Sequence, residues 1–144
     1  MNIVIGVDPD SEAHGVAIYR EKELIDLSCM PLMEFMGQIK LHKNLGDNIK
    51  VIIENVKANK GTFAKSFVKN AAASKGVAQG VGMCKQSQSE LERMLDHLGI
   101  EYKLMPISKA WKKDKKQFEL VTGWTGRSNE DTRSAAYFGW LGLK

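Results

Sequence analysis

Two short β-branched runs, each ending in an acidic residue, constrain the fold of this chain more than any other feature. The run NIVIGVD ends at Asp8 and the run IKVIIE ends at Glu54, and both are apolar enough to form buried strands. In α/β proteins, binding sites lie where the carboxyl ends of strands meet at one edge of the sheet. If the two strands are neighbours, two carboxylates meet there, and their mutual repulsion and poor solvation are unfavourable.

A bound hard cation makes two neighbouring carboxylates favourable, because it attracts both. Mg²⁺ takes oxygen ligands and is held by a few carboxylates together with substrate phosphate. Two such ions about 3.5–4 Å apart activate water and stabilise the leaving oxygen in phosphoryl transfer. The residues alone leave two other interpretations open: Asp8 caps the turn DPD, or Glu54 pairs with Lys57 at the surface.

The remaining pattern predicts one α/β domain over residues 1–144 with a mixed sheet. Strands are expected at 3–7, 14–20, 23–28, 49–55 and 101–106. Helices are expected at 32–42, 62–75, 87–98, 107–122 and from 128 onward. We find no internal repeat, low-complexity tract or linker.

Charge and cysteine content narrow the class of partner and the compartment. Net charge is +4 and the pI is about 9.0, and lysines gather at 57–85 and 109–116, close to Phe63, Phe67 and Trp111. Basic clusters with aromatic neighbours favour a nucleic-acid backbone as partner. No apolar run approaches the roughly 20 residues that cross a bilayer, so no membrane partner is expected. The N-terminal residues enter a strand pattern directly, and Cys29 and Cys84 are isolated, so we expect a reducing cytoplasm.

Five segments, taken in order, resemble RuvC-type Holliday junction resolvases of the RNase H-like superfamily. They are IGVDPDSEAHGVAIY, VIIENV, KGTFAKSFVKNAAASKGVAQGV, YKLMPISKAWKK and TGWTGRSNEDTRSAAYFGW. The third segment is most similar to phage-encoded members. The resemblance covers almost the whole chain and implies an RNase H-like fold, with a central mixed five-stranded sheet flanked by helices.

The resemblance also implies a catalytic, metal-binding set of Asp8, Glu54 and Asp131, with Mg²⁺ as cofactor and Mn²⁺ as its substitute. Spacing alone also allows Asp131 to be the acid of a helix-capping box that begins at Ser128. The family usually has a further acid one helical turn later, and here that position is Ser134. Glu130 is the neighbouring acid available to substitute for it.

The function that the resemblance implies is structure-selective cleavage of four-way DNA junctions in recombination and repair. A metal-activated water would make paired symmetric nicks that leave 5′-phosphate and 3′-hydroxyl ends. A two-fold symmetric junction implies a homodimer, with residues 71–82 as its interface or, alternatively, buried inside the monomer. If the chain is phage-encoded, the compartment is the host cytoplasm. The expected DNA-binding residues are Lys57, Lys60, Lys65, Lys112 and Lys113, with Phe67 stacking on an unpaired base.

Two alternatives to junction cleavage stay open. One is a nuclease of the same fold that acts on other branched DNA or on RNA–DNA hybrids. The other is a junction-binding protein that does not cleave, because Ser134 stands where an acid is expected.

Overall fold

The computed structural model describes residues 1–58 and 71–144, and the side chains of 1–58 and 82–144. In this part of the chain five strands form one sheet in the order β3-β2-β1-β4-β5. Antiparallel pairs join β1 to β2 and β2 to β3, whereas β4 is parallel to both β1 and β5. The predicted mixed five-stranded sheet is therefore confirmed. The strands are β1 Asn2–Asp8, β2 His14–Arg20, β3 Glu23–Met30, β4 Asn48–Glu54 and β5 Glu101–Met105.

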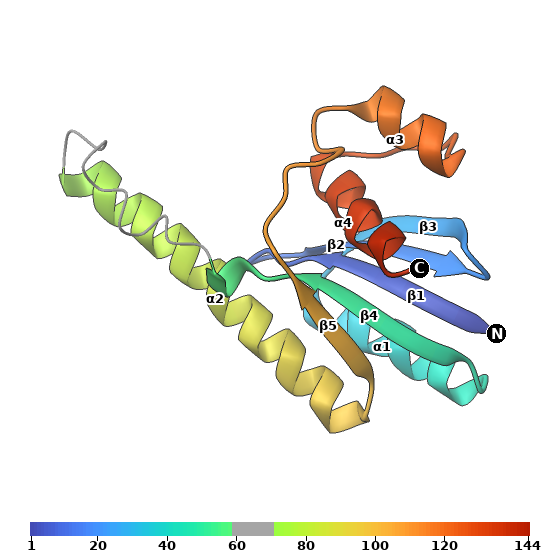
Figure 1. Ribbon diagram of the computed structural model, residues 1–144. Coiled ribbons are helices and arrows are strands. Elements are labelled where there is room, and N and C mark those ends of the chain that lie inside the picture. Colours follow the sequence, from blue (N-terminus) through green and yellow to red (C-terminus); the bar gives the residue numbers. More distant parts are fainter. Residues whose placement is uncertain (59–70) are drawn as a thin grey trace.

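Helices cover both faces of the sheet (Figure 1). On one face lie α1 and α2, and on the other lies α4, with α3 beyond it. The helices are α1 Leu32–Asn44, α2 Ala71–Leu98, α3 Lys115–Thr122 and α4 Glu130–Leu141, and a short 3-10 helix, Val56–Ala58, follows β4.

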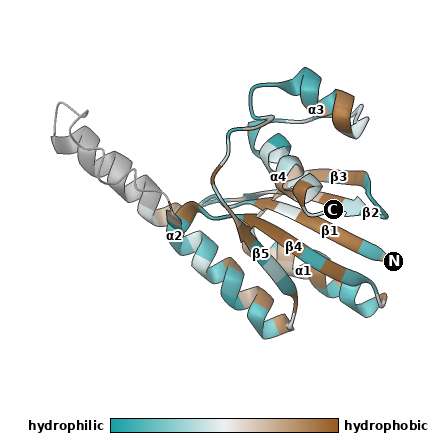
Figure 2. Cartoon of the chain, in the orientation of Figure 1, coloured by the Kyte–Doolittle hydropathy of each residue, from teal (hydrophilic) through white to brown (hydrophobic). Residues whose placement is uncertain are grey.

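The alternation of side chains along the strands divides the core into two layers. Figure 2 shows β1 and β4 as hydrophobic along most of their length. On β1, Ile3, Ile5 and Val7 point to the layer under α1 and α2, and the residues between them face α4. On β2, Ala17 and Tyr19 belong to the second layer, under α4. Alternate residues of a strand therefore pack against different helices.

The packing of α4 on the sheet is unusually close because glycines line the contact. A Cβ at Gly6 of β1 would overlap the Ala135 carbonyl oxygen and the Gly139 backbone of α4. The buried hydroxyl of Tyr19 donates a hydrogen bond of 2.7 Å to the carbonyl of Ala136. Backbone touches backbone along this line, so the position of α4 over β1 and β2 is narrowly determined.

Two predicted helices differ from the structure. The stretch predicted as a helix at 107–122 is helical only from Lys115, after the N-cap Asp114. Trp111 has a positive φ of 66°, and its ring packs against Phe118, Tyr137 and Trp140. This tertiary anchoring outweighs the helix-forming composition of the segment, and the predicted stop at Gly123 is confirmed by its left-handed φ of 72°.

The predicted helix starting at Ser87 is also wrong, because α2 runs unbroken from Ala71 to Leu98. Ser87 lies inside it rather than at a cap. Residues 59–70, in which the other predicted helix begins, lie outside the described residues. None of the helices that the structure describes is long and apolar enough to span a membrane.

We predict that Gly139→Ala destabilises the protein by about 1–3 kcal/mol, the usual cost of overpacking. The added methyl group would overlap the Tyr19 ring and crowd the backbone of Gly6. Gly37→Ala in α1 is the matched control, because nothing lies within 4 Å of its added carbon. The control is expected to gain up to about 1 kcal/mol from helix propensity. Urea unfolding measures both, and equal effects would contradict the close packing described above.

Candidate active site

The register of β1 and β4 brings Asp8 and Glu54 together. Val7 pairs with Ile53 in the parallel ladder, so each acid is the next residue on its own strand. Because Val7 and Ile53 both face α1 and α2, alternation directs both acids to the α4 side. The two carboxylates are nearly buried, with 5% and 4% of their residue surfaces exposed.

Asp131 reaches the same edge because the first turn of α4 rests on β2. Gly15 pairs directly with Asp8, and a Cβ at Gly15 would overlap the backbone of Asp131. The negative charge of Asp131 contributes to raising the pKa values of both Asp8 and Glu54. The structure therefore places near one another the three acids that the resemblance to RuvC-type resolvases singled out.

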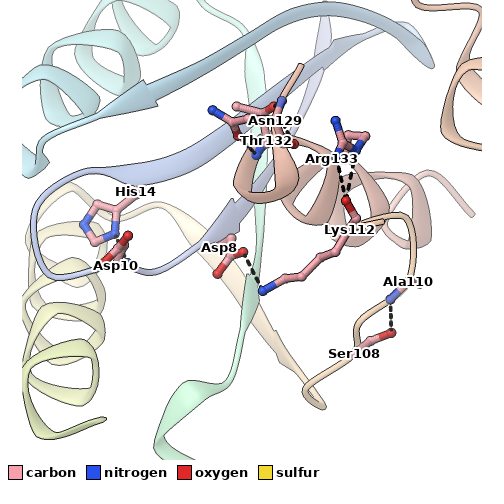
Figure 3. Close-up of polar contacts among 9 residues, drawn as sticks. All are labelled: Asp8, Asp10, His14, Ser108, Ala110, Lys112, Asn129, Thr132 and Arg133. Carbon is pink, nitrogen blue, oxygen red and sulfur yellow. Dashed lines mark hydrogen bonds and ion pairs between the residues drawn. The ribbon is translucent and has the colours of Figure 1, made fainter. Parts of the chain in front are cut away.

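The capping alternative for Asp131 is wrong. The N-cap of α4 is Asn129, whose side chain accepts from the Thr132 backbone N–H at 2.8 Å. The Thr132 hydroxyl accepts in return from the Asn129 N–H at 2.9 Å (Figure 3). With the cap formed by this pair, Asp131 is left to face the other acids.

Burial and mutual repulsion make the charged forms of these acids costly. Burial raises the pKa of Glu54 to about 7, the charge of Asp8 adds to the rise, and Lys112 opposes it. Burial likewise raises the pKa of Asp8, against the lowering effects of Lys112 and the Ser134 hydroxyl. Asp8 Oδ2 and Glu54 Oε2 are buried and have no hydrogen-bond partner among the described residues. The site is built from carboxylates that lack adequate solvation.

Lys112 provides a positive charge at this site. Its Nζ lies 3.5 Å from Asp8 Oδ2 (Figure 3). Burial disfavours the ammonium form of Lys112, but the charges of Asp8, Glu54 and Asp131 outweigh burial and raise its pKa. The side chain predicted to bind a DNA backbone therefore pairs with the acids in this structure.

Arg133 of α4 holds the loop that carries Lys112. Its Nη2 donates to the Lys112 carbonyl at 2.6 Å, and its Nε donates to the Trp111 carbonyl at 3.1 Å. Nη1 donates to the Ser128 hydroxyl at 3.0 Å. Helix α4, which carries Asp131, thus also holds the loop of Lys112, through the bonds from Arg133 to the Lys112 carbonyl drawn in Figure 3.

Ser134 lies in the site, whereas Glu130 does not. Ser134 is fully buried and its Oγ has no hydrogen-bond partner among the described residues. Its effect on the pKa of Asp8 places the hydroxyl beside that carboxyl. Glu130 is exposed and is not among the charges that shift the pKa of Asp8 or Glu54.

The donor set fits a hard cation in kind, but it is not a preformed metal site. Within the described residues, no group of three or more His, Cys, Asp or Glu side chains stands close enough to hold one ion. Two buried carboxylate oxygens without a hydrogen-bond partner among the described residues and a third acid beside them are nevertheless the kind of oxygen ligand that Mg²⁺ prefers. In this arrangement Lys112 supplies the compensating charge.

The other predicted contact residues lie in several places. Lys57 forms an ion pair of 2.6 Å with Glu92 of α2, so the alternative in which Glu54 pairs with Lys57 is wrong. Lys113 is exposed in the loop before α3. Lys60, Lys65 and Phe67 lie outside the described residues, as do the side chains of 71–81 in the expected dimer interface.

Sequence reasoning missed the residues that hold the site's acids and lysine in place without belonging to the site themselves. Arg133, Gly6 and Gly15 carry no catalytic signature, and the contacts by which they place the site join distant segments of the chain. The glycines did leave a signal, because a glycine inside a strand often marks close approach by another backbone. Arg133 left none, since the carbonyls of Trp111 and Lys112 that it binds are more than 20 positions away.

The arrangement of these elements matches solved structures of RuvC. The structure of T. thermophilus RuvC in complex with a Holliday junction substrate has a TM-score of 0.57, 12% sequence identity, and covers 97% of this chain and 91% of its own. The chain has the RuvC fold. A second Thermus thermophilus RuvC structure gives a TM-score of 0.53 at 12% identity, over 96% of this chain and 91% of that one. No family model and no curated protein matches the sequence.

We predict an unusual pH dependence for the metal-free protein. The folded pKa of Glu54, about 7, exceeds its ordinary value of 4.5, so the folded state binds more protons between these values and loses stability as pH rises through them. Glu54→Gln removes this loss, worth roughly 3 kcal/mol by pH 8. Urea unfolding in EDTA from pH 4.5 to about 8 tests the difference.

The comparison between wild type and Glu54→Gln isolates this group. Burial lowers the pKa of His14, which gives a slope of the opposite sign, but both proteins contain it. Parallel pH profiles for the two proteins would contradict the prediction.

We predict that Lys112→Met destabilises the metal-free protein at pH 8 by about 1–3 kcal/mol, because it leaves buried acids without their cation. Lys113→Met is the matched control, since Lys113 is its exposed neighbour. The effect of Lys112→Met should shrink at pH 5, where Glu54 is protonated. Urea unfolding in EDTA measures the free energy of unfolding of both variants. An equal decrease in the two would contradict this interpretation.

Proposed function

We propose that this protein is a Mg²⁺-dependent, structure-selective endonuclease that resolves four-way DNA junctions by paired symmetric nicks. The observation that carries the proposal is the group of acids at one sheet edge, in which Asp8 Oδ2 and Glu54 Oε2 are buried without a hydrogen-bond partner among the described residues and only Lys112 pairs with Asp8. Such carboxylates are costly unless a cation balances them. A site with more buried negative than positive charge suits metal-dependent chemistry on an anionic substrate.

The choice of substrate rests on two similarities. A RuvC structure with the same fold is a complex with a Holliday junction substrate. Segments around Asp8, Glu54 and Asp131 resemble the corresponding motifs of RuvC-type resolvases. The net charge of +4 agrees with a nucleic-acid partner.

Asp8, Glu54 and Asp131 are the residues that would hold Mg²⁺, or Mn²⁺ in its place. Bound Mg²⁺ supplies a nucleophilic water and stabilises the leaving oxygen of a phosphodiester. The fixed loop beside the acids keeps Lys112 at the same edge, within reach of a phosphate backbone that lies across it. Lys57, Lys60, Lys65 and Lys113 would extend this contact, and Phe67 would stack on an unpaired base.

Symmetric cleavage requires two copies of the site. A four-way junction has two-fold symmetry, so matched nicks need two active sites related by the same symmetry. We therefore propose a homodimer that acts in DNA recombination and repair in the cytoplasm, that of the host if the chain is phage-encoded. Residues 71–82 stay our candidate for the dimer interface, with burial inside the monomer as the alternative.

Ser134 supports a second candidate function, a junction-binding protein that does not cleave. The residue is buried beside Asp8, where RuvC-type resolvases usually have a further acid. A site with one carboxylate fewer holds less negative charge for a divalent cation. A third candidate is a nuclease for other branched DNA or for RNA–DNA hybrids.

One assay separates the three candidates. A synthetic four-way junction, plain duplex, a flap and an RNA–DNA hybrid are incubated with the protein in Mg²⁺, Mn²⁺ or EDTA. Paired symmetric nicks confined to the junction support resolution. Cleavage of the flap or hybrid alone supports the third candidate, and binding without product in Mn²⁺ supports the second.

We predict that Ser134→Asp increases junction cleavage at limiting Mg²⁺ by at least about tenfold, because it adds a carboxylate where the site has only a hydroxyl. Ser134→Asn is the matched control, similar in size but uncharged. Asp8→Asn is expected to abolish cleavage while junction binding persists. Cleavage that is unaffected by Asp8→Asn would contradict the assignment of the site.

A further inference from the structure

A buried glutamine of α2 contacts the chain immediately after Glu54. Gln88 is fully buried, and its Oε1 accepts a hydrogen bond of 3.1 Å from the backbone N–H of Lys57. Its Nε2 donates to Asn55 Oδ1 at 3.0 Å and to Glu92 Oε2 at 3.2 Å. A buried amide is costly unless its donors and its acceptor are paired, and here they are paired. The side chain therefore ties α2 to the first and third residues after the acid.

Glu92, one turn further along α2, extends the same network. Its Oε2 lies 2.6 Å from Lys57 Nζ, and its Oε1 accepts a hydrogen bond of 3.5 Å from the hydroxyl of Tyr102 on β5. The network thus joins α2, β5 and the residues that follow β4. Gln88 lies at its centre, because it bonds to Asn55, Lys57 and Glu92.

The network holds β4 at the point where its pairing with the neighbouring strands ends. The residue pairs with β1 end at Ile53, and those with β5 end at Glu54, opposite Met105. The N–H of Asn55 still donates to the Met105 carbonyl at 2.8 Å. The ends of strands open more readily than their centres, so a tie to α2 directly after Glu54 reinforces the part of β4 that carries the acid.

The alternation of side chains links Gln88 to the direction of the Glu54 carboxylate. Ile53 faces α1 and α2, and Glu54 therefore faces α4. Asn55 returns to the α2 side, where Gln88 binds it. Rotation of the chain about the strand axis at Asn55 would turn the Glu54 side chain away from Asp8. The bond on one face of the sheet thus fixes the neighbouring side chain on the other face.

We propose that Gln88 is a positioning residue for Glu54, because it holds the end of β4 so that the carboxylate stays beside Asp8. The inference rests on the proposed function in so far as Glu54 binds a metal ion. Replacing residues that orient metal ligands without touching the metal typically lowers metal affinity about 10- to 100-fold.

Mn²⁺ titration of the Gln88→Met variant, followed by the electron paramagnetic resonance signal of free Mn²⁺, tests the proposal without DNA. Methionine has a similar length but lacks the amide, so the affinity for Mn²⁺ should fall about tenfold. Asn55→Ala removes the partner of this amide and should also weaken binding. The double variant should weaken binding by less than the product of the two single effects, because both substitutions break the same bond.

Leu95→Ala is the matched control for lost stability, because Leu95 is a fully buried core residue of the same helix. The control should melt at a lower temperature but keep its affinity for Mn²⁺, measured where circular dichroism shows every variant folded. Unchanged affinity in Gln88→Met, or an equal loss of affinity in Gln88→Met and Leu95→Ala, would overturn the proposal.

Hydrogen exchange in EDTA separates failure of this inference from failure of the proposed function. The amides of Asn55 and Ala58 bond to the carbonyls of Met105 and Asn55, and in Gln88→Met both should exchange at least about tenfold faster than in the wild type. A wild type that binds no Mn²⁺ would contradict the proposed function, and exchange would then decide the inference alone. Unchanged exchange at both amides would overturn it.

Discussion

The contact between α4 and the sheet is the constraint on which the site depends. Gly6 and Gly139 let the helix backbone rest on β1, and Gly15 lets the first turn of α4 touch β2 beside Asp8. A methyl group at any of these glycines would move the helix outward. Asp131, Ser134 and Arg133 all belong to α4, so one packing interaction sets the third acid, the buried hydroxyl and the clamp on the Lys112 loop together.

A second feature is the excess of buried negative charge at the site, which Lys112 partly balances. The alternation of side chains along β1 and β4 places Asp8 and Glu54, and the packing of α4 places Asp131. Lys112, in contrast, lies in an irregular loop that Trp111 and Arg133 anchor. An ammonium on a long side chain can balance carboxylates in the metal-free protein and still leave when a divalent cation competes for them. Under the proposed function, the site would combine acids fixed by the fold with a lysine that a metal ion displaces.

The two faces of the molecule divide its surfaces by chemistry. Asp8, Lys112 and the anchored loop lie together beside the first turn of α4 (Figure 3), whereas exposed apolar side chains of α1, Met33 and Leu41, lie on the other side of the sheet.

The sequence by itself determined the strands, the acids at their ends and the order of elements, because β-branched runs and chain polarity are local properties. It also predicted the strand-ending acids Asp8 and Glu54, since a charge at the end of a buried run is visible in one segment. Only the tertiary structure decided that Asn129 caps α4 in place of Ser128, that residues 107–114 are not helical, and that Lys112 faces Asp8. These outcomes depend on contacts between distant segments, such as Arg133 with the Lys112 carbonyl, and local propensity does not encode such contacts.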